Sequence, residues 1–325
     1  MTVSRSLAFA ILSLFLILFG RTALAQEKIT YLLPAPAGEP AFAPFMIAQH
    51  KGYYAAEGLT VTFQSGKGGA DVAKQVGSGN ADLGGALGDT PLIVRQNGIP
   101  VKGVALLGGR PLHQLAVRAD RGIAGPKDLA GKTINVFSYQ DTSYFATLTV
   151  LATGGLTKDQ VTIRAAGPVG MWQLVASGEA DGLVGAPEFA FKAQQSGNMD
   201  LRWIPLEGIF PGMAQAIMAS DETIEKRPEM IGKFVRATLK AIAEIVADPR
   251  AAVNAYLEAV PAHKDNPNLV RATLPFYANK VYPGQVKLGL FDPARVAALQ
   301  QIYLANGMAK EARPVEEFFT NRFVP

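Results

Sequence analysis

The segment SGNADLGGALGD, which begins at Ser78, is closely repeated as SGEADGLVGAPE from Ser177. Both copies read S-G-x-A-D, continue with a short apolar run, and place an acid seven residues after the Asp. The glycine suits the left-handed turn that ends a helix, and the apolar run is typical of a buried strand. We expect Asp82 and Asp181 to bond the local backbone at these turns. A repeated turn of this kind predicts two similarly built units.

The order of elements around the motif is repeated as well. In the first half, strand-like runs alternate with helical segments, and residues 131–197 restart the same order after a short interval. Strands that alternate with helices at this pitch predict a mostly parallel sheet. We therefore predict an α/β fold of two similar lobes, each built on a mostly parallel sheet.

Two extended runs, residues 113–120 and 212–220, frame the second half of the chain. Two adjacent crossings between lobes predict a two-strand hinge. After Ser220 the apolar residues recur at helical spacing, and we expect these helices to pack on the first lobe. The predicted boundaries are 26–113 with 219–325 for the first lobe and 114–218, including the hinge strands, for the second lobe.

The first 25 residues have the pattern of a cleaved export signal. Arg5 precedes an apolar run from Leu7 to Phe19, and the segment ends in Ala-Leu-Ala at Ala25. The run is shorter than the ~20 residues that a membrane-spanning helix needs. We expect cleavage after Ala25, a periplasmic location and no membrane span in the mature chain.

The composition argues against several functions. The whole chain carries a net charge of +4, and the export signal accounts for two of its arginines, so no nucleic-acid partner is expected. The chain contains no Cys, and His50, His113 and His263 lie far apart in sequence, which argues against a zinc site. No nucleophile motif is present, and no cofactor is expected.

Several segments together resemble a known family. They are PAFAPFMIAQHKGYYAAEGLTVTF, GSGNADLGG, DLAGKTINV, ASGEADGLVGAPE and RPEMIGKFVRATLKAIAEIVADPRAA. They resemble the type II periplasmic solute-binding proteins of ABC importers, in the subgroup that binds sulfonates, taurine, nitrate and thiamine-pyrimidine precursors. The resemblance implies a monomer that closes on a small solute and delivers it to a membrane permease and its ATPase. A related enzyme makes the thiamine pyrimidine but depends on a Cys-rich motif, so we expect a binding protein and not an enzyme.

The resemblance also implies where the ligand lies, in the loops that follow the strands of both lobes. Open α/β sheets bind ligands at this edge. The candidate ligand-binding residues are Phe42, Gly68, Gly69, Asp89, Thr90, Arg110, Ser138, Tyr139, Thr142, Ser143, Gly170, Pro187 and Glu188.

Two ligand classes remain open at this point. If the lobes are equivalent, Asp89 and Glu188 face one cleft from opposite sides, and two carboxylates there favour an amine, amidine or aminopyrimidine. Alternatively, both acids are helix-start residues that interact with the helix dipole. Arg110 and Lys67 could reach the same cleft and would favour a small anion such as a sulfonate, taurine or nitrate.

Overall fold

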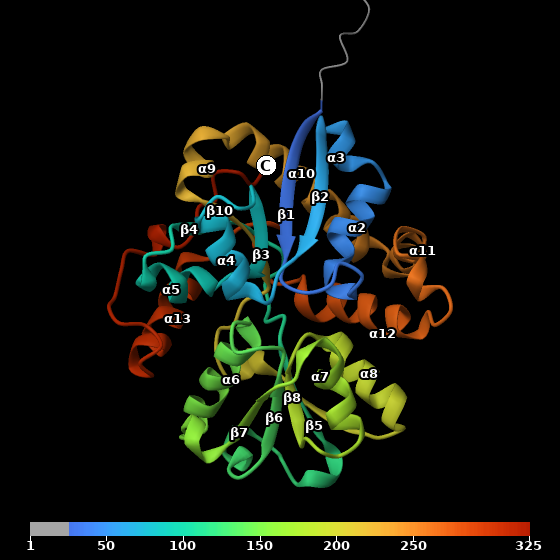
Figure 1. Cartoon of the computed structure of the whole chain (residues 1–325), viewed down its shortest axis with the longest axis vertical. Coiled ribbons are helices and arrows are strands. Elements are labelled where there is room, and N and C mark those ends of the chain that lie inside the picture. Colours follow the sequence, from blue (N-terminus) through green and yellow to red (C-terminus); the bar gives the residue numbers. More distant parts are fainter. Residues whose placement is uncertain (1–25) are drawn as a thin grey trace, which may run out of the picture.

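The computed structural model describes residues 26–325, so the predicted export signal lies outside the described residues. Two five-stranded sheets with their surrounding helices form an upper and a lower lobe (Figure 1). The first sheet contains β1 (Glu27–Leu33), β2 (Leu59–Ser65), β3 (Leu83–Leu87), β4 (Val101–Leu106) and β10 (Gln215–Ser220). The second sheet contains β5 (Gln114–Arg118), β6 (Thr133–Val136), β7 (Thr162–Ala165), β8 (Gly182–Gly185) and β9 (Leu201–Ile204).

The helices follow the same division (Figure 1). The first lobe has α2 (Ala43–His50), α3 (Tyr53–Ala56), α4 (Gly69–Gly77) and α5 (Thr90–Val94). The second has α6 (Thr142–Thr153), α7 (Gly167–Ala176) and α8 (Pro187–Gly197). The C-terminal part has α9 (Asp221–Lys226), α10 (Pro228–Ala247), α11 (Pro249–Ala259), α12 (Asn268–Phe276) and α13 (Pro293–Ala305).

The two sheets have equivalent strand orders, β2-β1-β3-β10-β4 and β7-β6-β8-β5-β9. This confirms the predicted α/β architecture of two similar lobes. Each sheet is mostly parallel, with a single antiparallel strand, β10 in the first and β5 in the second. These are the strands that follow the two crossings. Each enters its sheet at the cleft and runs away from it, whereas the other strands run towards it.

The crossing strands differ from the predicted hinge in one respect. We assigned residues up to 218 to the second lobe, but β10 pairs with β3 and β4 in the first sheet. Each crossing strand is therefore anchored within one lobe, and the connection between the lobes lies in the segments just before β5 and β10. Strand β9 was not anticipated, because its short sequence has no clear alternation.

The repeated S-G-x-A-D motif has the same structure in both lobes. Gly79 and Gly178 adopt left-handed φ values of 75° and 85°. The Asp82 carboxylate accepts a hydrogen bond from the Thr30 backbone N–H at 2.6 Å, and Asp181 accepts one from Thr133 at 2.8 Å. Each Asp thus joins its turn to the neighbouring strand, as expected for a structural role.

The C-terminal helices complete the first lobe and also reach the second. Phe234 of α10 stacks on Tyr31 and on Tyr54, with ring centroids 4.9 Å apart in each pair. Helix α12, however, contacts α8 of the second lobe as well as α11, so the expected packing on the first lobe is only part of the arrangement (Figure 1). Within residues 26–325, no helix combines the length and the apolar character needed to cross a membrane.

Candidate ligand-binding site

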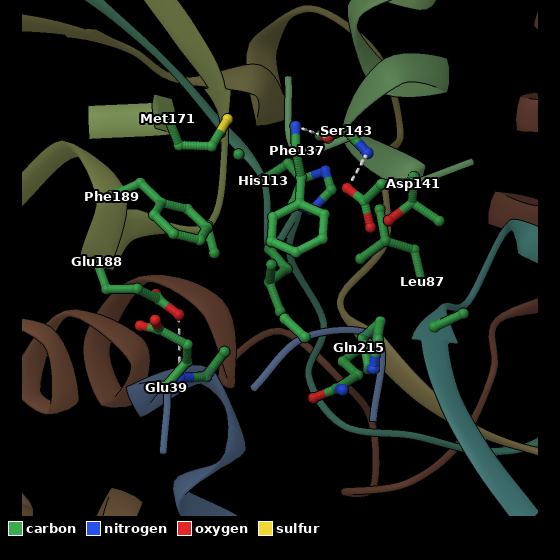
Figure 2. A pocket seen from close by; sticks show the side chains of 18 of the residues that line it. Glu39, Leu87, His113, Phe137, Asp141, Ser143, Met171, Glu188, Phe189 and Gln215 are labelled. Atoms are coloured by element: carbon green, nitrogen blue, oxygen red, sulfur yellow. Dashed lines mark hydrogen bonds between the residues drawn. The ribbon is translucent and has the colours of Figure 1, made fainter. Parts of the chain in front are cut away.

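A cavity lies between the lobes, at the carboxyl ends of β1, β3, β6 and β8 (Figure 2). It contains about 550 Å³ of space free of protein atoms, part of it continuous with solvent. The lining residues are Pro34, Ala35, Glu39, Ala41, Phe42, Ala86, Leu87, Leu112, His113, Phe137, Asp141, Thr142, Ser143, Met171, Gly185, Ala186, Glu188, Phe189 and Gln215. Both lobes therefore contribute to one site, which is partly open to solvent.

The charged groups that line this cavity are all acidic. Glu39, Asp141 and Glu188 lie on it, and the lining set includes no Lys or Arg. Lys192 lies just outside and pairs with Glu39 at 2.8 Å, so one of the three carboxylates is partly neutralised. The side chains of His113, Gln215, Thr142 and Ser143 add further polar groups. The charge of the site therefore favours a ligand that is neutral or positive.

Glu188 lies at the start of α8 and is 1% exposed. Its carboxylate accepts hydrogen bonds from the Ala41 backbone N–H at 3.3 Å and from the Tyr277 hydroxyl at 2.9 Å. Both donors belong to the opposite side of the cleft. Burial, and next the charge of Glu39, raise the pKa of Glu188 to about 7. This carboxyl group thus titrates near neutrality and joins the two lobes.

On the other side of the cleft, the start of α6 meets the start of α4. The Asp141 side chain accepts a hydrogen bond from the Ser143 N–H at 2.8 Å (Figure 2). It accepts another from the Gly69 N–H of the first lobe at 3.3 Å. The Ala70 N–H donates to the Gln140 carbonyl at 3.0 Å. The lobes are therefore in contact on both sides of the cavity, which is a closed arrangement.

Aromatic rings form an apolar wall of the cavity. The rings of Phe137, after β6, and Phe189, in α8, lie with centroids 6.3 Å apart (Figure 2). Phe42 and Met171 contribute from the first and second lobes. Aromatic side chains of this kind can pack against a planar ring. Together, the rings and the acids fit a heterocycle that carries N–H donors.

Four of the predicted ligand-binding residues line the cavity: Phe42, Thr142, Ser143 and Glu188. Phe42 follows β1 after a Pro-rich loop. Thr142 and Ser143 begin α6, where the Ser143 hydroxyl accepts a hydrogen bond from the Phe137 N–H at 3.0 Å. The family resemblance implied these positions, and the rule that ligands lie beyond the carboxyl ends of strands gives the same placement. All four residues lie on the cavity wall.

Several predicted residues lie at the junction of the lobes but outside the cavity lining. Gly68 and Gly69 lie at the start of α4, and a Cβ added to Gly68 would lie 2.8 Å from the Asp141 Cα. The Ser138 hydroxyl donates to the Lys67 carbonyl at 3.0 Å. These residues bring the lobes close together and do not face the ligand space.

The remaining predicted residues are elsewhere. Tyr139 is 51% exposed, and Gly170 lies within α7, where its carbonyl accepts a hydrogen bond from Asn135. Arg110 is partly exposed and donates to the Asn279 carbonyl at 3.4 Å. Pro187 is buried at the first turn of α8.

Asp89 and Thr90 are buried at the start of α5, behind the cavity wall. The equivalence of the lobes suggested that Asp89 and Glu188 face each other across the cavity. This prediction is wrong for Asp89, which lies outside the cavity lining. The two acids occupy matching positions after β3 and β8, but Asp89 accepts a hydrogen bond from Tyr303 of α13. The C-terminal helix has no counterpart in the second lobe, and it draws this carboxylate away from the cleft.

Glu39, His113, Asp141 and Gln215 were not predicted as ligand-binding residues, although the loop that contains Asp141 was. The Asp141 side chain accepts a hydrogen bond from the Ser143 N–H at the start of α6. An Asp directly before a helix is a known N-cap pattern, so the sequence did contain a signal for the position of this carboxylate. His113 and Gln215 flank the two crossings, which lie side by side: the Leu112 N–H donates to the Met213 carbonyl at 3.2 Å, and both His113 and Gln215 line the cavity.

Two lobes with equivalent sheets that enclose a cavity at their junction define the type II periplasmic binding protein fold. Among solved structures, the alkanesulfonate-binding protein SsuA from Xanthomonas axonopodis pv. citri, bound to MOPS, has this fold with a TM-score of 0.69. The two chains are 18% identical, and the alignment covers 91% of this chain and 98% of the other. The chain belongs to the NMT1/THI5-like family, whose model matches residues 39–252.

Two curated relatives carry different functions. The chain is 30% identical over 295 residues to the riboflavin-binding protein RibY of Chloroflexus aurantiacus, covering 87% of this chain and 82% of the relative. It is 26% identical over 251 residues to the 4-amino-5-hydroxymethyl-2-methylpyrimidine phosphate synthase of Aspergillus parasiticus, covering 73% and 72%. The relatives of this chain thus include both a binding protein and an enzyme.

Proposed function

We propose that this protein is the extracytoplasmic solute-binding subunit of an ABC importer and that its ligand is a neutral or cationic nitrogen heterocycle. The observation that carries the proposal is the enclosed cavity between the lobes, with three carboxylates and no Lys or Arg among its lining residues. In this account the ligand holds the lobes closed, and the closed form is delivered to the permease.

The cavity favours N–H donors over anions. Glu39, Asp141 and Glu188 can accept hydrogen bonds from amino or ring N–H groups, and such charge-assisted bonds contribute about 1.5–3 kcal/mol each. A sulfonate would meet Asp141 and Glu188 without a Lys or Arg among the lining residues, since Arg110 and Lys67 lie elsewhere and Lys192 is already paired with Glu39. We therefore favour the amine or aminopyrimidine class over sulfonate, taurine or nitrate.

The relatives support a heterocycle without identifying it. One is named for riboflavin and another for an aminopyrimidine, and both compounds are planar nitrogen heterocycles. Phe137 and Phe189 offer such a ring an aromatic wall.

We also propose that the protein binds its ligand without transforming it. The related synthases leave an enzymatic role open, but the chain contains no Cys, and the Cys-rich motif of the pyrimidine-forming enzyme is therefore absent. The expected export signal, ending at Ala25, would place the mature protein where a solute-binding subunit acts.

A ligand panel tests both points. Thermal unfolding is measured with 4-amino-5-hydroxymethyl-2-methylpyrimidine, riboflavin, taurine, ethanesulfonate and nitrate, and each compound is then recovered and analysed by mass spectrometry. A heterocycle should stabilise the protein and be recovered unchanged. Stabilisation by the sulfonates alone would contradict the ligand class, and a modified heterocycle would contradict the binding role.

A matched pair of variants locates the binding. Asp141→Asn should weaken heterocycle binding by about 1.5–3 kcal/mol, because it removes a charged acceptor from the cavity. Asp265→Asn makes the same change at an exposed position outside the cavity and should leave affinity unchanged. Equal affinities for the two variants would argue that the ligand binds elsewhere.

A further inference from the structure

A second, smaller cavity lies behind the ligand cavity, where the two crossings meet. Its wall includes Pro111 from the first crossing and Gly212 and Met213 from the second, and it has room for about one water molecule. Asp89 and His113 are the residues with charged or titratable side chains on its wall. His113 also lines the ligand cavity, so its ring separates the two spaces.

Asp89 has one oxygen that is bonded and one that is not. Its Oδ2 accepts a hydrogen bond from the Tyr303 hydroxyl, whereas Oδ1 is fully buried and has no partner within residues 26–325. The side chain is 5% exposed and does not cap α5, although it stands at the start of that helix. A buried carboxylate oxygen without a donor is costly, and an ordered water is the usual solution.

His113 also has a buried polar atom without a hydrogen-bond partner. Its Nδ1 is fully buried and has no hydrogen-bond partner among the described residues, while the side chain as a whole is 7% exposed. Burial lowers the pKa of His113, against the opposing charge of Asp141, so the ring is neutral at and above neutral pH. A neutral imidazole has one N–H, so one ring nitrogen is a hydrogen-bond donor and the other is an acceptor. The group that hydrogen-bonds to one nitrogen therefore determines whether the other nitrogen donates or accepts.

We propose that one water in the small cavity joins His113 Nδ1 to Asp89 Oδ1, and that Asp89 thereby fixes the His113 proton on Nδ1. In this arrangement the His113 Nδ1–H donates a hydrogen bond to the water, and the water donates one to the Asp89 carboxylate. The alternative, in which the water donates to both groups, leaves its own oxygen without a donor against a wall that includes Leu87, Leu206 and Phe210. Both arrangements make two hydrogen bonds at the water, but in the first both donors point towards the negative charge of Asp89.

The consequence for the ligand cavity rests on the proposed function. With the proton held on Nδ1, Nε2 of His113 is a hydrogen-bond acceptor, and Asp141, whose carboxylate is another acceptor, lines the same cavity. An exocyclic amino group carries two N–H donors and can satisfy both acceptors at once, whereas a carbonyl oxygen at the same place meets two lone pairs. Asp89 is thus a positioning residue that selects an amino-substituted ring through His113.

The tautomer can be measured without any ligand, which separates this inference from the proposed function. The chain has three histidines, so ¹⁵N-histidine labelling gives a simple spectrum, and a His113→Gln sample identifies the resonances of His113. At pH 8 the protein should show the proton on Nδ1 of His113. Asp89→Ala should move the proton towards Nε2, the tautomer that free histidine prefers.

Tyr303→Phe is the matched control, because it removes the other partner of Asp89 and keeps the carboxylate. It should leave the tautomer unchanged. A proton on Nε2 of His113 in the wild-type protein would overturn the proposal, even if neither variant folds. An unchanged tautomer in Asp89→Ala would also overturn it, as would a shift of the proton in Tyr303→Phe equal to that in Asp89→Ala.

A binding comparison tests the selectivity. Wild-type protein should prefer 4-amino-5-hydroxymethyl-2-methylpyrimidine over its 4-oxo analogue by at least about tenfold, and Asp89→Ala should reduce that ratio by about tenfold. An Asp89→Ala protein that keeps the full preference would refute the selection step. If neither compound binds while the tautomer is as stated, the ligand class fails and the assignment of the His113 proton stands.

Discussion

Replacement of Glu188 by Gln should change how the stability of the protein depends on pH. Glu188 is 1% exposed, and its pKa is raised from 4.5 to about 7, first by burial and then by the charge of Glu39. The folded protein therefore holds this proton more tightly than the unfolded chain does. Protonation of Glu188 stabilises the fold, and this contribution is lost as the pH rises from about 4.5 through about 7.

The magnitude follows from the two pKa values. Between pH 8 and pH 5, protonation of this one group should raise the free energy of unfolding by about 2–3 kcal/mol. Gln carries no titratable proton, so Glu188→Gln should lack this increment. The hydrogen bonds lost to Ala41 and Tyr277 lower stability at every pH, and they cancel when only the change with pH is compared.

Urea denaturation of both proteins at pH 5 and at pH 8 gives the comparison. The difference in unfolding free energy, wild type minus Glu188→Gln, should be larger at pH 5 than at pH 8 by about 2–3 kcal/mol. Glu179→Gln makes the same change at an exposed position of the same lobe and should show no such dependence. A difference that is constant with pH, or larger at pH 8, would refute the reasoning about Glu188.

Three further changes test other parts of the account. Gly69→Ala adds a Cβ 2.9 Å from the Thr142 side chain across the cleft. Small-angle scattering of the variant with ligand should therefore show a less compact particle than wild type. A particle as compact as wild type would contradict this close contact. Asp181→Ala removes the acceptor of the Thr133 N–H and should lower the free energy of unfolding by about 1–3 kcal/mol. Ligand affinity, measured by calorimetry, should be unchanged, and a loss of affinity would show that this Asp has a binding role. Phe137→Ala removes an aromatic wall and should weaken heterocycle binding by at least about tenfold, whereas equal affinity would show that the ring is not a contact.

The architecture could be predicted from the sequence because local signals repeat. The S-G-x-A-D turn, with Gly79 and Gly178 in left-handed conformations, marks equivalent points in both lobes, and the strand orders are equivalent as well. Parallel strands and their helices produce strong periodic patterns of apolar residues. The two crossings were predicted, but the antiparallel direction of β5 and β10 and the sheet to which β10 belongs could not be read from their own residues.

The candidate site was predictable only in part, because much of it is assembled by long-range contacts. Glu188 and Thr142 follow strands of the second lobe, and simple rules for α/β proteins locate them. His113 and Gln215 reach the cavity because the two crossings lie side by side, a relation that no local pattern encodes. Asp89 lies outside the cavity because Tyr303, more than two hundred residues further along the chain, binds it.

Calorimetric titration of the wild-type protein with an aminopyrimidine and with a sulfonate tests the central claim most directly. The claim is that the acid-lined cavity between the lobes binds a neutral or cationic nitrogen heterocycle. We predict that 4-amino-5-hydroxymethyl-2-methylpyrimidine or riboflavin binds with a Kd of ~0.1–10 µM, equivalent to about −7 to −10 kcal/mol, and that ethanesulfonate gives no measurable heat of binding. Micromolar binding of ethanesulfonate, with no binding of either heterocycle, would contradict the account.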